Sequence, residues 1–333
     1  MHGQFVWYEL TTPDVDASIK FYPRFTGWGT QRFDKDYVMW TTGGVPIGGI
    51  FKQTPEQKAQ GVPPNWLPYV ETNDVDATAA KAKSLGATVI VGPDDIPGTG
   101  RFAVLQDPQG AAFAIYRSSN QSGGWDGTPV VGRFSWHELM TTDHVKAAQF
   151  YSALFGWEKI SEMDMGGGQM YYMYGQKGQM YGGMFSMTKE MAGMHPFWLV
   201  YITVKDVGKA VDIATKAGAT VIRPQMDIPG GSIAILSDPQ GAGYAVHHVS
   251  APAAAPKPAA APKVAAKKAA PKKKAAPKKK AAPKKKAKAK APARKAGKVA
   301  KKARPKAKAK KAKAASRKKA AKARPRRKAK SKK

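Results

Sequence analysis

The sequence predicts an α+β protein in which two tandem modules are followed by a disordered basic tail. The first observation is a gapless internal match, GQFVWYELTTPDVDASIKFYPRFTGW at 3–28 against GRFSWHELMTTDHVKAAQFYSALFGW at 132–157. The second is that each module reads strand, helix, strand, strand, strand, after which the order partly repeats. The third is charge: 37 of the 56 Lys and Arg, and no acid, lie in residues 251–333, which leaves residues 1–250 with a formal charge of −4.

The internal match continues beyond the first block. YVMWTTGGVPIGGIF from Tyr37 resembles YYMYGQKGQMYGGMF from Tyr171, and residues 66–98 resemble residues 198–230. Both modules then reach Asp-Pro-Gln-Gly. We therefore place the modules at 1–118 and 131–250, joined by a Gly- and Ser-rich linker at 119–130.

The first strand and helix of each module have local signals. Residues 5–10 alternate with period two, as in a strand. Asp14 and Asp143 are good N-caps because a carboxylate accepts the free amide hydrogens of a first helical turn. The spacing of apolar residues then predicts one helix up to Gly27 in the first module and a matching helix in the second.

The later part of each module supplies another strand, another helix and a hairpin. The strands are predicted at 66–71 and 198–204, with helices capped near Asp74 and Asp206. The hairpins bend at Asp-Pro-Gln-Gly, where Asp bonds its own backbone, Pro presets φ and Gly accepts a positive φ.

These motifs resemble the vicinal oxygen chelate superfamily, which includes glyoxalase I, extradiol dioxygenases and bleomycin-resistance proteins. The resemblance rests on F-x-W-[YH]-E-L-x-T-x-D, a helix ending F-Y-x-x-x-x-G-W, a Gly-Gly hairpin and a closing D-P-x-G strand. It covers nearly all of residues 1–250 and implies glyoxalase-like modules of paired βαβββ units. A ligand or metal is then expected in a cleft enclosed by the curved sheets.

The resemblance also implies where a divalent metal would be held. Metal-holding members place one ligand on the first strand and a Glu on the strand after D-P-x-G. The corresponding residues here are Trp7 and Trp136, and Ala114 and Ala245. Neither side chain donates a lone pair to such a cation. We therefore expect no metal cofactor and no reaction that depends on one.

Other polar residues lie close to these positions. Glu9 and Tyr116 in the first module, and Glu138 and His247 in the second, each lie two residues further along the same strand face. Three interpretations stay open for the Glu138–His247 pair: a buried hydrogen bond, ligand recognition or acid/base chemistry, and a displaced metal site. His137 and His248 alternate to the opposite face. Because five of the six histidines belong to the second module, any catalysis is expected there, with Glu138 and His247 as candidates.

Aromatic and methionine side chains on the strands suit either a core or a planar apolar ligand. The residues predicted to contact a small apolar or aromatic ligand are Trp7, Glu9, Tyr116, Trp136, Glu138 and His247. The chain has no nucleophile elbow, P-loop or dinucleotide fingerprint. Two further histidines are expected to be incidental: His144 in the first turn of a helix and His195 in a loop.

The tail predicts nucleic-acid binding without sequence recognition. Residues 269–286 read AAPKKK three times, and the composition resembles the C-terminal tail of linker histone H1. Uncompensated charge and repeated Pro predict a disordered chain that binds phosphates by counterion release. The phosphate-binding residues predicted in this repeat are Lys272, Lys273, Lys274, Lys278, Lys279, Lys280, Lys284, Lys285 and Lys286.

Two function hypotheses from different classes follow. In the first, the body binds a small molecule without a metal and is tethered to DNA by its tail. If the body is an enzyme, it is expected to be a lyase or an oxidoreductase. In the second, the protein is an architectural nucleoid protein with an inert body; a metal-dependent lyase or dioxygenase with a displaced site is a third alternative. No apolar run is long enough for a membrane helix and no export signal is readable, so a cytoplasmic, nucleoid-associated monomer or homodimer is expected.

Overall fold

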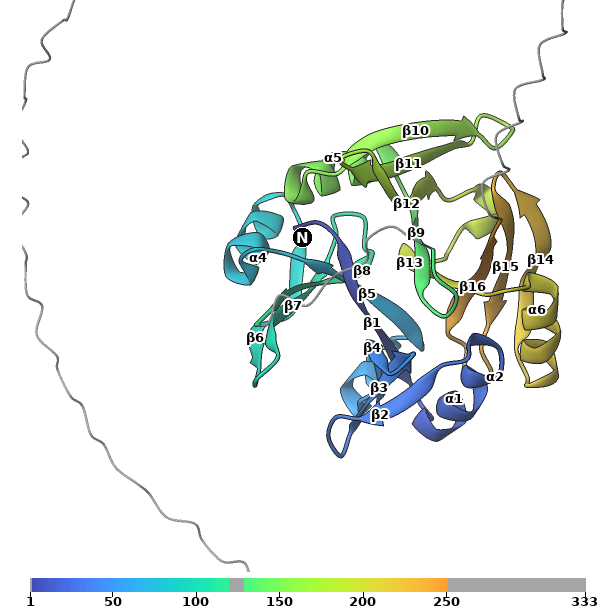
Figure 1. Ribbon diagram of the computed structural model, residues 1–333. Coiled ribbons are helices and arrows are strands. Elements are labelled where there is room, and N and C mark those ends of the chain that lie inside the picture. The colour runs from blue at the N-terminus through green and yellow to red at the C-terminus, as the bar shows by residue number, and fades with distance from the viewer. Residues whose placement is uncertain (1, 120–128, 251–333) are drawn as a thin grey trace, which may run out of the picture. The chain divides into compact units, whose positions relative to one another are not determined.

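The computed structural model describes residues 2–119 and 129–250 (Figure 1). Most of the predicted linker, at 120–128, and the whole predicted tail with its lysines, at 251–333, lie outside the described residues. Each module forms one curled eight-stranded sheet, the first in blue to teal and the second in green to orange. The predicted fold class, two tandem glyoxalase-like modules, is confirmed.

The first module has the strand order β2-β3-β4-β1-β5-β8-β7-β6. Strands β1 and β4 run parallel, as do β5 and β8, while β1 and β5 are antiparallel at the centre. Each half of the module is thus one βαβββ unit. The elements are β1 (Phe5–Thr12), α1 (Val15–Phe21), α2 (Pro23–Thr26), β2 (Gly29–Arg32), β3 (Tyr37–Thr42), β4 (Val45–Lys52), α3 (Pro55–Ala59), β5 (Asn65–Glu71), α4 (Val75–Ser84), β6 (Thr88–Ile96), β7 (Gly100–Gln106) and β8 (Ala112–Ser118).

The second module repeats this topology with the order β10-β11-β12-β9-β13-β16-β15-β14. Its elements are β9 (Phe134–Thr141), α5 (His144–Phe155), β10 (Glu158–Asp164), β11 (Met170–Gln176), β12 (Gln179–Ser186), the 3₁₀ turn η1 (Lys189–Met191), β13 (Phe197–Thr203), α6 (Val207–Lys216), β14 (Thr220–Ile228), β15 (Gly231–Ser237) and β16 (Gly243–Val249). In the described part of the chain, no helix is long and apolar enough to cross a membrane.

The helix starts are confirmed, but the first helix of the first module is broken. The Asp14 side chain accepts a hydrogen bond from the backbone amide of Ala17. The Asp143 side chain accepts hydrogen bonds from the amides of Val145 and Lys146 in the first turn of α5. We expected one helix up to Gly27; α1 instead ends at Phe21 and Pro23 begins α2. Pro has no N–H to donate to the preceding turn, which interrupts the helix. The matching residue of the second module is Ser152, and α5 is continuous.

The two modules pack on each other through reciprocal buried hydrogen bonds. The Tyr22 hydroxyl donates to Asp238 Oδ2 at 3.0 Å, and the Tyr151 hydroxyl donates to Asp107 Oδ2 at 3.0 Å. Each aspartate is the first residue of an Asp-Pro-Gln-Gly turn. Its other carboxylate oxygen accepts hydrogen bonds from backbone amides in and just after that turn, as predicted. The turn that closes one module is therefore bonded to the helical Tyr of the other.

Other matched positions meet at the same interface. The Trp28 indole donates to the carbonyl of Gly132 at 2.7 Å, and the Trp157 indole donates to the carbonyl of Gly3 at 2.7 Å. Such exchanged contacts are the signature of a two-fold relation, here within one chain. The residues on the helix-covered faces of both sheets consequently form one continuous hydrophobic core.

Candidate functional site

The face of each sheet that carries no helix holds the polar residues of interest. Tyr8 and Leu10 of β1 point into the shared core, so Trp7 and Glu9 point to the opposite surface. Trp136 and Glu138 on β9 are placed in the same way. We call these two surfaces the helix-free faces of the first and second modules. Trp and Glu share a face in both modules, as the spacing predicted.

On the first helix-free face, Glu9 is held by two tyrosines from flanking strands. The Tyr37 hydroxyl, from β3, donates to Glu9 Oε1 at 2.7 Å. The Tyr69 hydroxyl, from β5, donates to Glu9 Oε2 at 2.6 Å. The Trp7 indole N–H in turn donates to the Tyr37 hydroxyl at 3.0 Å. Both carboxylate oxygens are therefore fixed by neutral donors.

The second helix-free face repeats this arrangement atom for atom. Tyr171 donates to Glu138 Oε1 at 2.8 Å and Tyr201 donates to Glu138 Oε2 at 3.0 Å. The Trp136 indole donates to the Tyr171 hydroxyl at 2.8 Å. We call each four-residue set a Trp-Tyr-Glu-Tyr network. Its duplication places a carboxyl at the centre of each sheet, partly buried at Glu9 and buried at Glu138.

A glycine beneath the first tyrosine makes each network possible. A methyl group added at Gly49 would lie 1.8 Å from the Tyr37 hydroxyl oxygen, and one added at Gly183 would lie 2.1 Å from the Tyr171 ring. The second glycine of each Gly-Gly pair therefore leaves room for a tyrosine ring to cross its strand and reach the carboxyl.

Burial sets the protonation behaviour of the networks. Removal from water raises the pKa of Glu9 and of Glu138, and the tyrosine hydrogen bonds, which favour the charged carboxylate, oppose this rise. Burial also raises the pKa of Tyr37 and Tyr171, an effect that the neighbouring carboxylate reinforces. The tyrosines thus stay protonated donors at neutral pH.

Tyr116 and His247 have hydrogen-bond partners other than the glutamates, so the buried hydrogen bond that was one interpretation of the Glu138–His247 pair is not formed. The Tyr116 hydroxyl donates to the carbonyl of Thr99 at 2.9 Å. His247 Nδ1 lies 2.9 Å from the Ser135 hydroxyl, and its ring meets the Tyr201 ring edge-on with centroids 6.2 Å apart. Burial lowers the pKa of His247 to about 4, and the charge of neighbouring His248 adds to this lowering. The carboxyl groups instead bond to tyrosines on the strands beside them.

Sequence reasoning missed these four tyrosines, Tyr37, Tyr69, Tyr171 and Tyr201. Their signal was present, because each pair occupies matched positions in the two modules, as do Trp7 and Trp136 and the glutamates. What the sequence did not supply was the strand order, which brings β3, β4, β1 and β5 side by side.

The residues at the implied metal positions do not fit a divalent cation. Trp7 is bonded to Tyr37, and Ala114, opposite Tyr69 on the neighbouring strand, has no donor atom. Ala245 lies opposite Tyr201 in the same way. Within 2–119 and 129–250, no three His, Cys, Asp or Glu side chains are grouped so as to hold a metal.

Three further histidines, His137, His144 and His195, lie where the sequence placed them. His137 is fully buried in the shared core, where Nε2 lies 2.6 Å from the Tyr8 hydroxyl and burial lowers its pKa to about 3. His144 is the first residue of α5, and His195 lies in the loop before β13.

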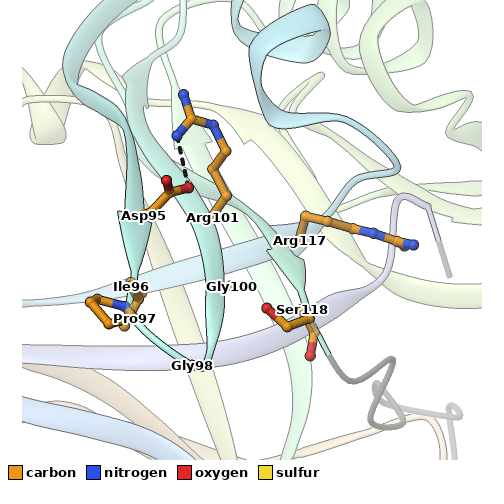
Figure 2. Close-up of a pocket in the computed structure, with 9 residues that line it drawn as sticks. Asp95, Ile96, Pro97, Gly98, Gly100, Arg101, Arg117 and Ser118 are labelled. Atoms are coloured by element: carbon orange, nitrogen blue, oxygen red, sulfur yellow. Dashed lines mark hydrogen bonds and ion pairs between the residues drawn. The ribbon is translucent and has the colours of Figure 1, made fainter.

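A separate open pocket of about 450 Å³ lies at the β6–β7 hairpin of the first module (Figure 2). Its charged groups already pair with each other, since Arg101 binds Asp95 at 2.8 Å and Asp76 at 2.8 Å. The lining residues include Arg117 and Ser118 but no member of a Trp-Tyr-Glu-Tyr network. This pocket therefore offers no unpaired charge from Arg101 to a ligand.

Comparison with known proteins agrees with this architecture. The chain is 32% identical over 279 residues to the anthracycline biosynthesis protein DauV of Streptomyces sp. (strain C5), covering 76% of this chain and 96% of that protein. It is 34% identical over 251 residues to the putative glyoxylase CFP32 of Mycobacterium bovis, covering 72% of this chain and 92% of that protein.

Two solved structures share the fold at low sequence identity. The Mn(II)-bound glyoxalase of Novosphingobium aromaticivorans has a TM-score of 0.52 and 14% identity, over 74% of this chain and 82% of that one. The 2,3-dioxygenase LapB of Pseudomonas sp. KL28 has a TM-score of 0.54 and 12% identity, over 75% and 94%. The family model of the Glyoxalase/Bleomycin resistance protein/Dioxygenase superfamily matches residues 4–115 and 133–246. The chain therefore belongs to this superfamily.

Proposed function

We propose that the two modules form a small-molecule-binding body that takes a planar aromatic ligand on a helix-free face without a bound divalent metal. The observation that carries the proposal is the duplicated Trp-Tyr-Glu-Tyr network. It puts an indole, two phenols and one oriented carboxyl where metal-holding relatives are expected to bind their cation. Aromatic walls around a few fixed polar groups are typical of sites for organic ligands. The similarity to anthracycline biosynthesis proteins supports a polycyclic ligand.

The proposal is tested by thermal denaturation of the full-length chain, treated with EDTA, against an anthracycline in the absence of DNA. We expect the ligand to raise Tm in a concentration-dependent manner, because it binds the native state alone. Adding Mn²⁺ or Zn²⁺ should leave Tm unchanged. Near-stoichiometric metal in protein purified without a His tag, lost on Glu138→Gln or His247→Ala, would overturn the metal-independent mechanism.

We further propose that residues 251–333 hold this body on nucleic acid. The support for this proposal is the charge of the segment, which contains 37 Lys and Arg residues and no Asp or Glu. These side chains would displace counterions from at most about 37 phosphates, roughly 18 base pairs of duplex. The body contributes little to such attraction because its formal charge is −4.

A comparison of the full-length chain with residues 1–250 tests the tether. We expect the full chain to bind duplexes of unrelated sequence equally, with an affinity that falls steeply as salt rises. Truncation should remove both the affinity and the salt dependence in a mobility-shift titration. If residues 1–250 bind DNA with the same salt slope as the full chain, the tail is not the tether.

A further inference from the structure

The two helix-free faces share a network but differ in how far they are covered. In the second module, Phe185, Leu199 and Ile233 are exposed by 7%, 1% and 9% and form a separate buried cluster with Tyr201. The matching residues of the first module, Phe51, Leu67 and Phe102, are all partly exposed and belong to neither buried cluster. The second face is filled by its own side chains, whereas the first is not.

The cover of the second face comes from the segment that follows β12. Met187 and Met191 pack against the buried cluster, together with Phe197 at the start of β13. Methionine fills irregular gaps well because its side chain is long and flexible. This segment therefore closes the second face with apolar atoms.

The matching segment of the first module carries polar residues whose side chains form hydrogen bonds with the backbone of the same segment. Gln53, Gln57 and Asn65 take the places of Met187, Met191 and Phe197. The Gln53 side chain donates to the carbonyl of Val62, and the Gln57 side chain accepts the amide of Thr54 in a capping box. The polar groups of these side chains are therefore hydrogen-bonded within the segment itself. No residue of α3 is buried. The first face therefore lacks the apolar cover that the second face has.

The two carboxyl groups also differ in their electrostatic surroundings. Arg223 of β14 lies opposite Ile235, a residue packed on the second helix-free face. Burial raises the pKa of Glu138, and the positive charge of Arg223 opposes part of this rise. In the first module, Val91 occupies the equivalent position opposite Val104. Among the described residues, neither Lys nor Arg forms an ion pair with either glutamate, and no cation acts on Glu9 as Arg223 acts on Glu138. Glu9 is thus a partly buried carboxyl whose hydrogen-bond partners are neutral tyrosines.

We propose that the first helix-free face is the ligand site, that its ligand is a planar aromatic cation, and that the second face is a closed copy. A buried carboxylate without a cation is costly, and a ligand cation that reaches it recovers that cost. The surrounding rings of Trp7, Phe51 and Phe102 suit both stacking and cation–π contact. This inference rests on the proposed function and refines it, because it assigns the module and the charge of the ligand. It also moves the expected site from the second module to the first.

The test is a fluorescence titration of the full-length chain with two probes of the same ring size. One is 9-aminoacridine, a planar cation at pH 7, and the other is 2-aminoanthracene, which is neutral. We expect one site per chain, with the cation bound about tenfold or more tightly than the neutral probe. Glu9→Gln should remove this preference, and the matched Glu138→Gln should change neither affinity by more than about twofold.

A second variant adds the arginine of the second module to the first. Val91 is 42% exposed, so Val91→Arg should fold, and it should weaken the cation about tenfold while leaving the neutral probe unaffected. Equal binding of the two probes, or a larger loss in Glu138→Gln than in Glu9→Gln, overturns the inference yet leaves aromatic binding in place. Failure of both probes and of the anthracycline would remove the proposed function as well.

Discussion

Gly49 lies beneath the ring of Tyr37, and this single position governs how Glu9 is held. Each module has a Gly-Gly pair in its sequence, and that pair by itself predicts only a hairpin. The physical reason for the second glycine depends on a side chain from the neighbouring strand, which no local pattern describes. Trp7 and Glu9 could be placed on one face from their spacing alone, whereas their tyrosine partners could not.

Gly49→Ala should destabilise the protein by about 1–3 kcal/mol, because the new methyl group forces the Tyr37 ring off the strand and away from Glu9. Chemical denaturation followed by tryptophan fluorescence measures this change. Gly243→Ala is the matched control, since its nearest neighbour would be Leu199 at 3.9 Å. In a Tyr37→Leu background the penalty of Gly49→Ala should shrink. An equal penalty in both backgrounds would show that the tyrosine ring is not its cause.

The strands and helices that have their own start signals were predicted well. Asp74 and Asp206 cap α4 and α6, and β5 and β13 lie within one residue of the predicted strands. The exception was α1, where the prediction rested on apolar spacing and left out Pro23, which interrupts the backbone bonds. The contacts between elements of different modules could not be predicted from local patterns, since they join residues distant in sequence, 44 positions apart for Tyr151 and Asp107 and 216 for Tyr22 and Asp238.

Tyr22→Phe should cost about 2–4 kcal/mol, although it removes only one hydroxyl. That oxygen donates to buried Asp238 and accepts the Trp66 indole at 3.0 Å, so its loss leaves two buried polar groups unpaired. Equilibrium unfolding should show the same loss for Tyr151→Phe. Tyr172→Phe, at a partly exposed ring, serves as the control and should be nearly neutral. A neutral Tyr22→Phe would mean that the bond between helix and turn adds nothing to the interface.

The internal repeat correctly predicted two modules, and it left open whether they pair within one chain or between chains. The structure pairs them within the chain, through exchanged bonds of the same residue types. Module pairing depends on long-range packing, which the repeat itself does not encode. The positive net charge of +33 likewise describes the whole chain and not the described body.

Because both modules contribute to one core, neither should be stable alone. We expect residues 1–118 to be largely unfolded by circular dichroism, and residues 1–250 to unfold in one transition. Mixing residues 1–118 with residues 131–250 should restore structure. A cooperative melt of residues 1–118 alone would show that the shared core is dispensable.

Tyr8 and His137 occupy matched positions and meet each other, with their side chains 2.6 Å apart, between the rings of Phe5 and Phe134. A dimer of identical subunits would have to set the same residue on both sides of its axis, tyrosine against tyrosine or histidine against histidine. Joining the halves in one chain removes that requirement, so a donor stands on one side and an acceptor on the other. The same freedom lets the two helix-free faces carry different apolar cover, which two identical subunits could not do.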